Sequence, residues 1–209
     1  MQVENVLFAK TLGGPQRRID VQWEEAASVP RPDILISGDG RNVAVRGKDG
    51  RLHLMRSGKD AFAVKEWLAA DADARTPADA SLAEGVSCDT AGCVTQSAAG
   101  AVMALSLQPE ALADDCERAA VIVTARQPPS GCRASVIDAE RLRRQGALSL
   151  RSTRQGFTVD AVKPRGIDRP WSPAAGGDSV DGETTIPVSR PARQAVDATP
   201  AEVDLQADE

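Results

Sequence analysis

Tyrosine is absent from the 209-residue sequence, and only three phenylalanines and three tryptophans are present. Binding of single-stranded nucleic acid by base stacking requires exposed aromatic rings, so this scarcity argues against a stacking surface. Apolar residues still make up 42% of the chain, which is enough for a core of Ala, Val, Leu and Ile. Such a core suits a small α/β or α+β domain.

Histidine is nearly absent as well, since His53 is the only one in the chain. Dinuclear zinc hydrolases need several histidines together with carboxylates, so this class is excluded. A Gly-x-Ser-x-Gly nucleophile elbow and the glycine spacing of a phosphate-binding loop are also missing. The sequence therefore predicts a protein without catalytic residues, metal ligands or a cofactor. The remaining enzymatic alternative is a weak hydrolase that holds one metal ion with His53 and nearby aspartates.

Long apolar runs are missing too. No stretch of about 18 apolar residues occurs, which argues against a membrane-spanning helix. A secretory signal has a basic segment followed by an apolar core. Residues 1–18, MQVENVLFAKTLGGPQRR, lack this arrangement. Taken alone, the chain is therefore expected in the cytoplasm.

Negative charge is concentrated at one end of the chain. The net charge is −5, but residues 173–209 contain eight acidic and two basic residues, which leaves residues 1–172 close to neutral. The totals thus indicate neither a strong nucleic-acid footprint nor an acidic surface on the folded part. We divide the chain into a weakly patterned segment (1–30), a mixed α/β domain (31–172) and an acidic disordered tail (173–209).

Two Asp-Gly pairs separate short apolar runs at the start of the folded part. Asp-Gly is favoured in tight hairpin turns, so we expect an antiparallel meander with strands at 34–36, 43–45 and 52–54. A helix with Asp60 as its N-cap follows. A second β region is expected over residues 86–107.

The second half of the folded part alternates helices and strands. A helix starts at Pro109 and leads into a buried strand at about 120–125. A strand, a helix and two further strands follow between residues 133 and 162, with Asp138 as the N-cap and Gly146 as the C-cap of the helix. The expected fold is α/β or α+β, with a mixed β-sheet and a few short helices.

The four cysteines leave several alternatives open. They are spaced Cys-x4-Cys and Cys-x15-Cys, whereas zinc ribbons and thioredoxin-like redox centres need Cys-x-x-Cys. This spacing disfavours both a zinc site and a redox centre. Two disulfides remain, Cys88–Cys93 across a turn and Cys116–Cys132 at one edge of the sheet, beside the alternative of four buried thiols in a cytosolic protein.

Six segments occur in a characteristic order: RPDILISGDGRNVAVRGKDGRL, EWLAADADAR, CDTAGC, ADDCERAAVIVTARQPPSGC, VIDAERLRRQGALSLR and GIDRPWSP. From about Pro32 to Pro173, this series resembles the C-terminal soluble region of ComEC-type competence membrane proteins in their alphaproteobacterial form. That family is taken to conduct single-stranded DNA across the inner membrane during natural transformation. The resemblance implies a metallo-β-lactamase-like domain on the periplasmic face, where cysteines are oxidised.

The chain departs from the family pattern in three ways. It lacks the metal motif His-x-His-x-Asp-His, so the resemblance implies a degenerate, non-catalytic domain in which no residue can be carried over as a ligand. The membrane helices are missing, and residues 1–30 fall outside the resemblance. We therefore expect a truncated or misassigned reading frame, or a split gene. The implied partners are the transmembrane competence channel, which this chain lacks, and single-stranded DNA. No small-molecule substrate is indicated.

Basic residues on the first meander and on the last helix–strand pair are the candidates for contacts with DNA phosphates. They are Arg41, Arg46, Lys48, Arg51, Arg141, Arg143, Arg144, Arg151 and Arg154. The alternative for these side chains is an ordinary solvated polar face. The alternative to a DNA-uptake function is a stand-alone cytoplasmic protein, or a gene fragment, of unknown function.

Overall fold

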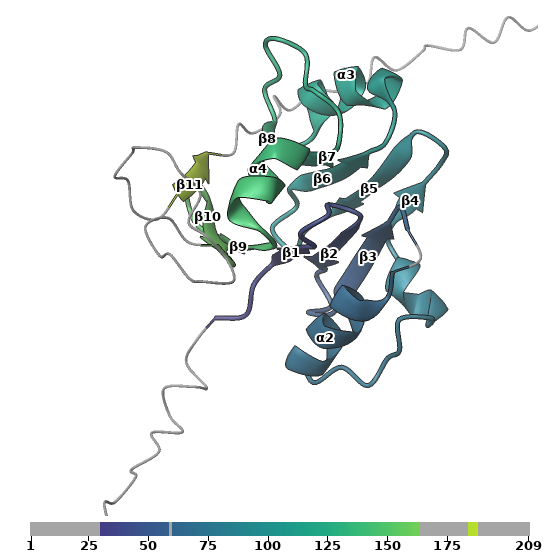
Figure 1. Cartoon of the computed structure of the whole chain (residues 1–209). Helices are drawn as coiled ribbons and strands as arrows, with labels where there is room; N and C mark the ends of the chain where they lie inside the picture. The colour runs from purple at the N-terminus through teal and green to yellow at the C-terminus, as the bar shows by residue number, and fades with distance from the viewer. Residues whose placement is uncertain (1–29, 59, 164–183, 188–209) are drawn as a thin grey trace, which may run out of the picture. The chain divides into compact units, whose positions relative to one another are not determined.

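The computed structural model describes residues 30–58, 60–163 and 184–187 (Figure 1). A division of the chain falls between Pro30 and Arg31, and the description below concerns the part that starts at Arg31. The expectations for residues 1–29 and for most of the acidic tail lie outside the described residues.

One sheet has six strands, each antiparallel to its neighbours, in the order β11-β10-β9-β1-β2-β3. These are β1 (Ile34–Ile36), β2 (Asn42–Arg46), β3 (Leu52–Arg56), β9 (Leu148–Ser152), β10 (Gly156–Ala161) and β11 (Thr184–Pro187). The expected meander is confirmed as β1, β2 and β3. In its two turns, Gly40 and Gly50 adopt φ angles of 69° and 77°, a backbone conformation that glycine accommodates without strain.

The other sheet has five strands in the order β4-β5-β6-β7-β8. These are β4 (Ser87–Cys88), β5 (Gly92–Gln96), β6 (Val102–Ser106), β7 (Val121–Thr124) and β8 (Ser135–Asp138). The first three strands are antiparallel, whereas β6, β7 and β8 are parallel. A parallel pair needs a crossover connection, and α3 (Pro109–Arg118) connects β6 to β7. The mixed α/β class is confirmed, but the strands form two sheets instead of one mixed sheet.

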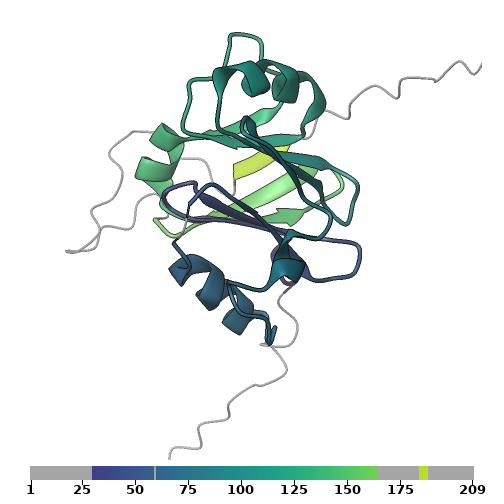
Figure 2. The same cartoon turned by 90° about the vertical axis from the view of Figure 1, so that its right-hand side faces the viewer.

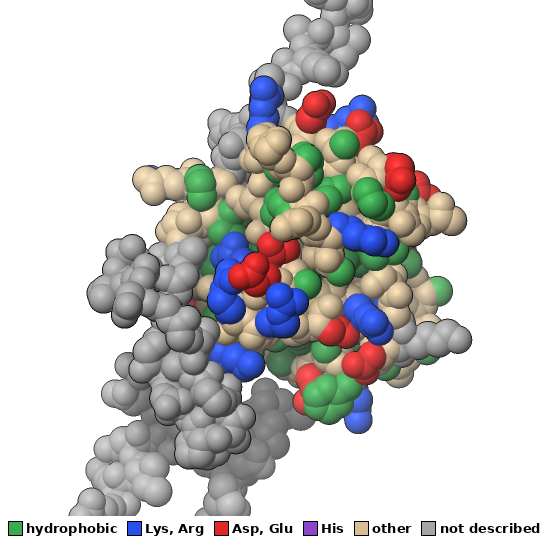
Figure 3. All heavy atoms as spheres, turned by 45° about the horizontal axis from the view of Figure 1, so that its top comes forward, with side chains coloured by type: hydrophobic (Ala, Val, Ile, Leu, Met, Phe, Trp, Pro, Cys, Tyr) green, Lys and Arg blue, Asp and Glu red, His purple; other side chains and the backbone are tan. Residues whose placement is uncertain are grey.

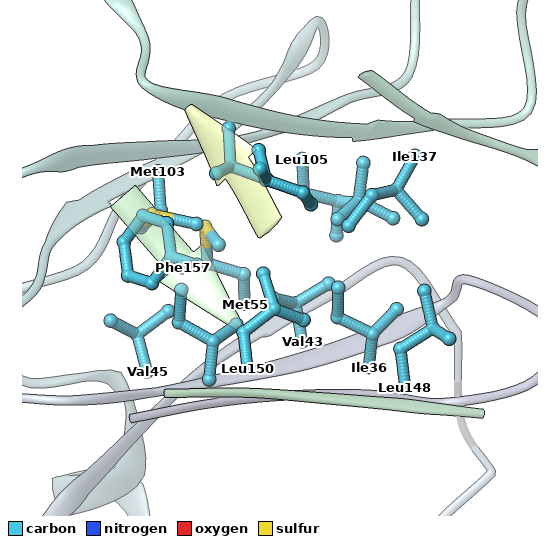
Figure 4. Close-up of a cluster of buried hydrophobic side chains, with 14 of the residues drawn as sticks. Ile36, Val43, Val45, Met55, Met103, Leu105, Ile137, Leu148, Leu150 and Phe157 are labelled. Carbon is cyan, nitrogen blue, oxygen red and sulfur yellow. The ribbon is translucent and has the colours of Figure 1, made fainter. Parts of the chain in front are cut away.

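The two sheets face one another across the main hydrophobic core. Alternate residues of β2 point to opposite faces, so Val43 and Val45 enter this core whereas Ala44 packs toward α2 (Phe62–Ala70). Figure 4 shows Met103, Leu105 and Ile137 of one sheet above the side chains of the other. Figure 2 shows α2 outside one sheet and α3 outside the other, so the layers run helix, sheet, sheet, helix.

Helix α4 (Ala139–Gln145) lies beside β8 and inserts Leu142 into the core between the sheets. Its expected caps are confirmed, because Asp138 Oδ1 accepts a hydrogen bond from the Arg141 N–H at 2.7 Å and Gly146 takes a φ of 74°. At α2 the N-cap residue is Ala61 instead of the expected Asp60. The Asp60 carboxylate still accepts from the Phe62 N–H at 2.9 Å.

Strand β11 is a correction to the sequence-based division. Residues 184–187 fall in the range expected to be a disordered tail, yet they pair with β10 and place Ile186 in the core, where it is only 4% exposed. The strand is also fixed on the other side, since the Ser135 hydroxyl of β8 donates to the Pro187 carbonyl at 3.2 Å. One isoleucine in a polar, acidic stretch gives no local pattern that would indicate a strand.

Candidate nucleic-acid interface

The nine candidate basic residues form different groups in the structure from those that they form along the sequence. The turn between β1 and β2 carries Arg41 and packs against α4, because a Cβ atom added to Gly40 would lie 2.9 Å from Leu142 Cδ1. Since α4 also carries Arg143 and Arg144, this packing brings together residues that are about a hundred positions apart in sequence.

Three other basic residues lie at the opposite end of the six-stranded sheet. Ile34 of β1 pairs with β2 just before the turn that carries Lys48, and with β9 just before the turn that carries Arg154. Arg51 belongs to the same end as Lys48. The candidate basic residues of the meander are therefore divided between the two ends of the sheet, and so are those of the last helix–strand pair.

Arg46 is engaged inside the protein, which corrects its assignment as a phosphate contact. Its side chain is only 11% exposed, and its guanidinium forms two hydrogen bonds of 2.9 Å with the Asp71 carboxylate. It also donates to the carbonyls of Pro32 and Gly50, at 3.1 and 2.7 Å. These bonds engage all three nitrogens of the guanidinium group and leave it unavailable to DNA.

Several of the other candidates are paired with neighbouring side chains. Arg144 pairs with Glu140, Arg151 pairs with Asp160, Arg141 Nε donates to Gln145 Oε1 at 2.8 Å, and Arg51 lies 3.7 Å from Asp73. Basic and acidic side chains lie interspersed on the face shown in Figure 3. Among the described residues, no carboxylate lies within 4 Å of the exposed basic groups of Arg41, Lys48, Arg143 and Arg154.

A cleft of about 600 Å³ opens beside Arg41, between the two sheets. Its walls are the β1–β2 turn, the residues that end β6 and β7, and the start of α4. Arg126, which follows β7, also lines it, and its exposed side chain donates through Nε to the Leu107 carbonyl at 3.2 Å. The sequence-based set omitted Arg126. The sequence feature that could have identified Arg126 is its position directly after a buried strand.

Asp39 is the acidic group of this cleft. Burial by itself would raise the pKa of Asp39, but hydrogen bonds from the Ser37 hydroxyl (2.6 Å) and the Arg41 N–H (3.0 Å), together with the positive charge of Arg41, outweigh burial. The pKa is consequently lowered, and the carboxylate is ionised at neutral pH. Both bonds hold it within the turn.

His53, the residue of the hydrolase alternative, lies in β3 beside a different cavity. Its Nε2 atom is 3.0 Å from Asp49 Oδ1, and its Nδ1 atom is buried without a hydrogen-bond partner among the described residues. The structure brings one carboxylate to this imidazole. In the part of the chain that it describes, no three or more potential metal ligands gather in one place.

The cysteines form two disulfides. Cys88 of β4 lies directly opposite Cys93 of β5, and Cys116 near the end of α3 bonds to Cys132, which precedes β8. No cysteine is left as a free thiol. The second disulfide ties the helix outside the five-stranded sheet to the edge of that sheet.

Comparison of the chain with protein-family models, with curated proteins and with solved structures gave no match. The helices within the described ranges are too short or too polar to span a lipid bilayer.

Proposed function

We propose that this chain is a non-catalytic domain of a ComEC-like competence protein, placed on the periplasmic face of the inner membrane, where it contacts incoming single-stranded DNA. The ordered sequence resemblance supports the family assignment. Two facing sheets with a helix outside each are compatible with a degenerate metallo-β-lactamase-like domain. The two disulfides suit an oxidising compartment.

The observation that carries the DNA-binding proposal is the packing of the Arg41 turn against α4. This contact brings the turn that carries Arg41 and the helix that carries Arg143 to the same end of the sheet, and both side chains are exposed without a carboxylate of a described residue within 4 Å. Guanidinium groups bind phosphate oxygens through charge-assisted hydrogen bonds, independently of base sequence. The scarcity of aromatic residues predicts backbone contacts with little base stacking.

Binding of a fluorescent oligothymidylate with a 5′-hydroxyl end, measured by anisotropy over a salt series, tests the proposal. For two phosphate contacts on single-stranded DNA, the plot of log K against log salt should have a slope of about −1.4. The double variant Arg41→Glu/Arg143→Glu should abolish binding at low salt. The matched control Arg118→Glu changes an exposed arginine on α3, outside the proposed surface. This variant should bind the oligonucleotide as tightly as the wild type does. Absence of wild-type binding at low salt would overturn the proposal.

The cytoplasmic alternative is tested by counting thiols on protein produced in the periplasm. The proposed function expects no alkylation before reduction and four alkylated cysteines after it. Four reactive thiols before reduction would favour the cytoplasmic alternative.

A further inference from the structure

The cleft beside Arg41 lies at a position in the fold that favours ligand binding. Leu105, Ser106 and Leu107 end or follow β6, and Thr124 ends β7, so this wall is formed at the carboxyl ends of two parallel strands. In sheets with parallel strands, ligands bind in the crevice outside these ends. The volume of about 600 Å³ is within the range of small-molecule sites, and it exceeds what a bare phosphate ion needs.

Each sheet contributes one arginine to the cleft. Arg41 comes from the β1–β2 turn, where its side chain lies along Gly58, and Arg126 comes from the segment after β7. No carboxylate of a described residue lies within 4 Å of either guanidinium. Arg126 uses Nε for the Leu107 carbonyl, which leaves its two terminal nitrogens for a ligand. Guanidinium groups match phosphate oxygens in geometry and charge.

The other polar groups of the cleft are partly engaged within the protein. The ionised Asp39 carboxylate opposes an anion, but its charge is partly offset by Arg41 and by two hydrogen bonds from its own turn, and the Ser106 hydroxyl donates to Asp115. The Thr124 hydroxyl accepts from the Arg126 N–H at 3.0 Å, which leaves its proton for donation to a ligand. Leu142 and Leu105 give the cleft an apolar part that a sugar or base can contact.

We propose that this cleft binds a phosphate monoester, either as a free nucleotide or as the 5′-phosphate of a DNA strand. A monoester carries a charge between about −1.5 and −2 at neutral pH, compared with −1 for each internal diester, so two arginines favour the terminal group. The DNA-end form rests on the proposed function, whereas the nucleotide form does not. Arg126 is specific to the cleft and is absent from the DNA surface proposed above.

The test compares decathymidylate with a 5′-phosphate, the same strand with a 5′-hydroxyl, and 5′-thymidylate, by calorimetric titration of the oxidised full chain. We expect tighter binding of the phosphorylated strand, and about tenfold or greater weakening of that preference in Arg126→Gln, because one charge-assisted hydrogen bond is lost. Arg118→Gln, remote on α3, should keep the preference. Thermal melting followed by circular dichroism establishes that each variant is folded.

The outcomes separate this inference from the proposed function. Equal affinity for the two strands without Arg126-dependent binding of 5′-thymidylate, or a preference that survives in Arg126→Gln, overturns the cleft inference even if salt-dependent DNA binding is observed. Binding of 5′-thymidylate that depends on Arg126, without binding of either strand, supports the cleft and overturns the DNA-contact proposal. No binding of 5′-thymidylate or of the phosphorylated strand at millimolar concentration also overturns the cleft inference.

Discussion

Arg46 and Asp71 are joined by two parallel hydrogen bonds of 2.9 Å, from Nη1 to Oδ2 and from Nη2 to Oδ1. Asp71 is the C-cap residue of α2, so the pair fixes the end of this helix to β2. The two side chains are 11% and 10% exposed, which distinguishes them from the solvated ion pairs of this protein. A bidentate arginine–carboxylate pair shielded from water contributes far more to structure than an exposed pair.

Arg46→Ala should therefore destabilise the fold. The substitution removes both hydrogen bonds from the largely buried Asp71 carboxylate and leaves it only the exposed Arg31, 3.7 Å away, so we expect the free energy of unfolding to fall by about 3 kcal/mol. Arg41→Ala is the matched control, because Arg41 is exposed and a surface substitution changes stability by at most about 0.5 kcal/mol. Urea unfolding measures both variants. A loss of less than about 1 kcal/mol in Arg46→Ala would contradict the structural role assigned to this pair.

Features governed by neighbouring residues could be predicted from the sequence. The Asp-Gly turns at Gly40 and Gly50 and the caps of α4 depend on backbone preferences over a few positions. A pattern of this local kind does not separate the exposed Arg41 from the enclosed Arg46, because the two residues lie on the same hairpin. Strand alternation specifies which side chains share a face, but it does not specify which partner those side chains contact.

Long-range pairing could not be predicted in this way. β1 joins β9 through the register of Ile36 with Leu148, and no local signal selects β9 over the strands of the other sheet. The division into two sheets follows from such choices, and so does the cleft, which needs Arg41 and Arg126 to come from different sheets. A candidate site of this kind emerges only once the layers are assembled.

Asp73 and Arg75 should make the stability of the protein sensitive to acid. The side-chain hydrogen bonds from Arg75, the shortest at 2.6 Å, hold the pKa of Asp73 at about 2, below its usual value of 3.8, although burial opposes this. The folded state therefore binds this proton more weakly than the unfolded state. The stabilisation is present above about pH 4 and is lost as the pH falls toward 2.

The Asp73→Asn variant tests this linkage by urea unfolding at pH 6, 4 and 2.5. We expect the wild type to exceed the variant in stability at pH 6 and the difference to shrink at pH 2.5. Arg75 also donates to the Leu52 carbonyl at the start of β3, at 2.8 Å, and because both proteins can form this bond it does not contribute to the difference. Parallel pH profiles for the two proteins would contradict the lowered pKa.

The two disulfides should differ in their contribution to stability. Cys116–Cys132 closes a loop with a sequence separation of 16, whereas Cys88–Cys93 spans only 5. The chain-entropy relation predicts about 3 kcal/mol for the longer loop and about 2 kcal/mol for the shorter. Urea unfolding of the two double variants, Cys116→Ala/Cys132→Ala and Cys88→Ala/Cys93→Ala, compares them under oxidising conditions. A larger loss from the shorter loop would show that chain entropy does not dominate here.

Gly156 should be essential for the attachment of β11. It pairs with Pro187 and has a φ of 150°, and a Cβ atom at this position would lie 1.9 Å from the Ile186 carbonyl oxygen. That distance is far inside van der Waals contact, and the neighbouring atoms are backbone that cannot rotate away. Gly156→Ala should therefore displace β11 from β10 and expose Ile186, with a loss of about 1.5–3 kcal/mol from the burial of its side chain.

Hydrogen–deuterium exchange of the peptide that contains Ile186, together with urea unfolding, measures this displacement. Gly38→Ala is the matched control, because its added Cβ would lie 3.5 Å from the nearest backbone atom, an ordinary contact. We expect faster exchange at residues 184–187 in Gly156→Ala and wild-type exchange there in Gly38→Ala. Because β11 lies at the edge of the sheet, the strands β1, β2 and β3 should keep their protection in both variants. Unchanged protection of β11 in Gly156→Ala would contradict the requirement for glycine at this position.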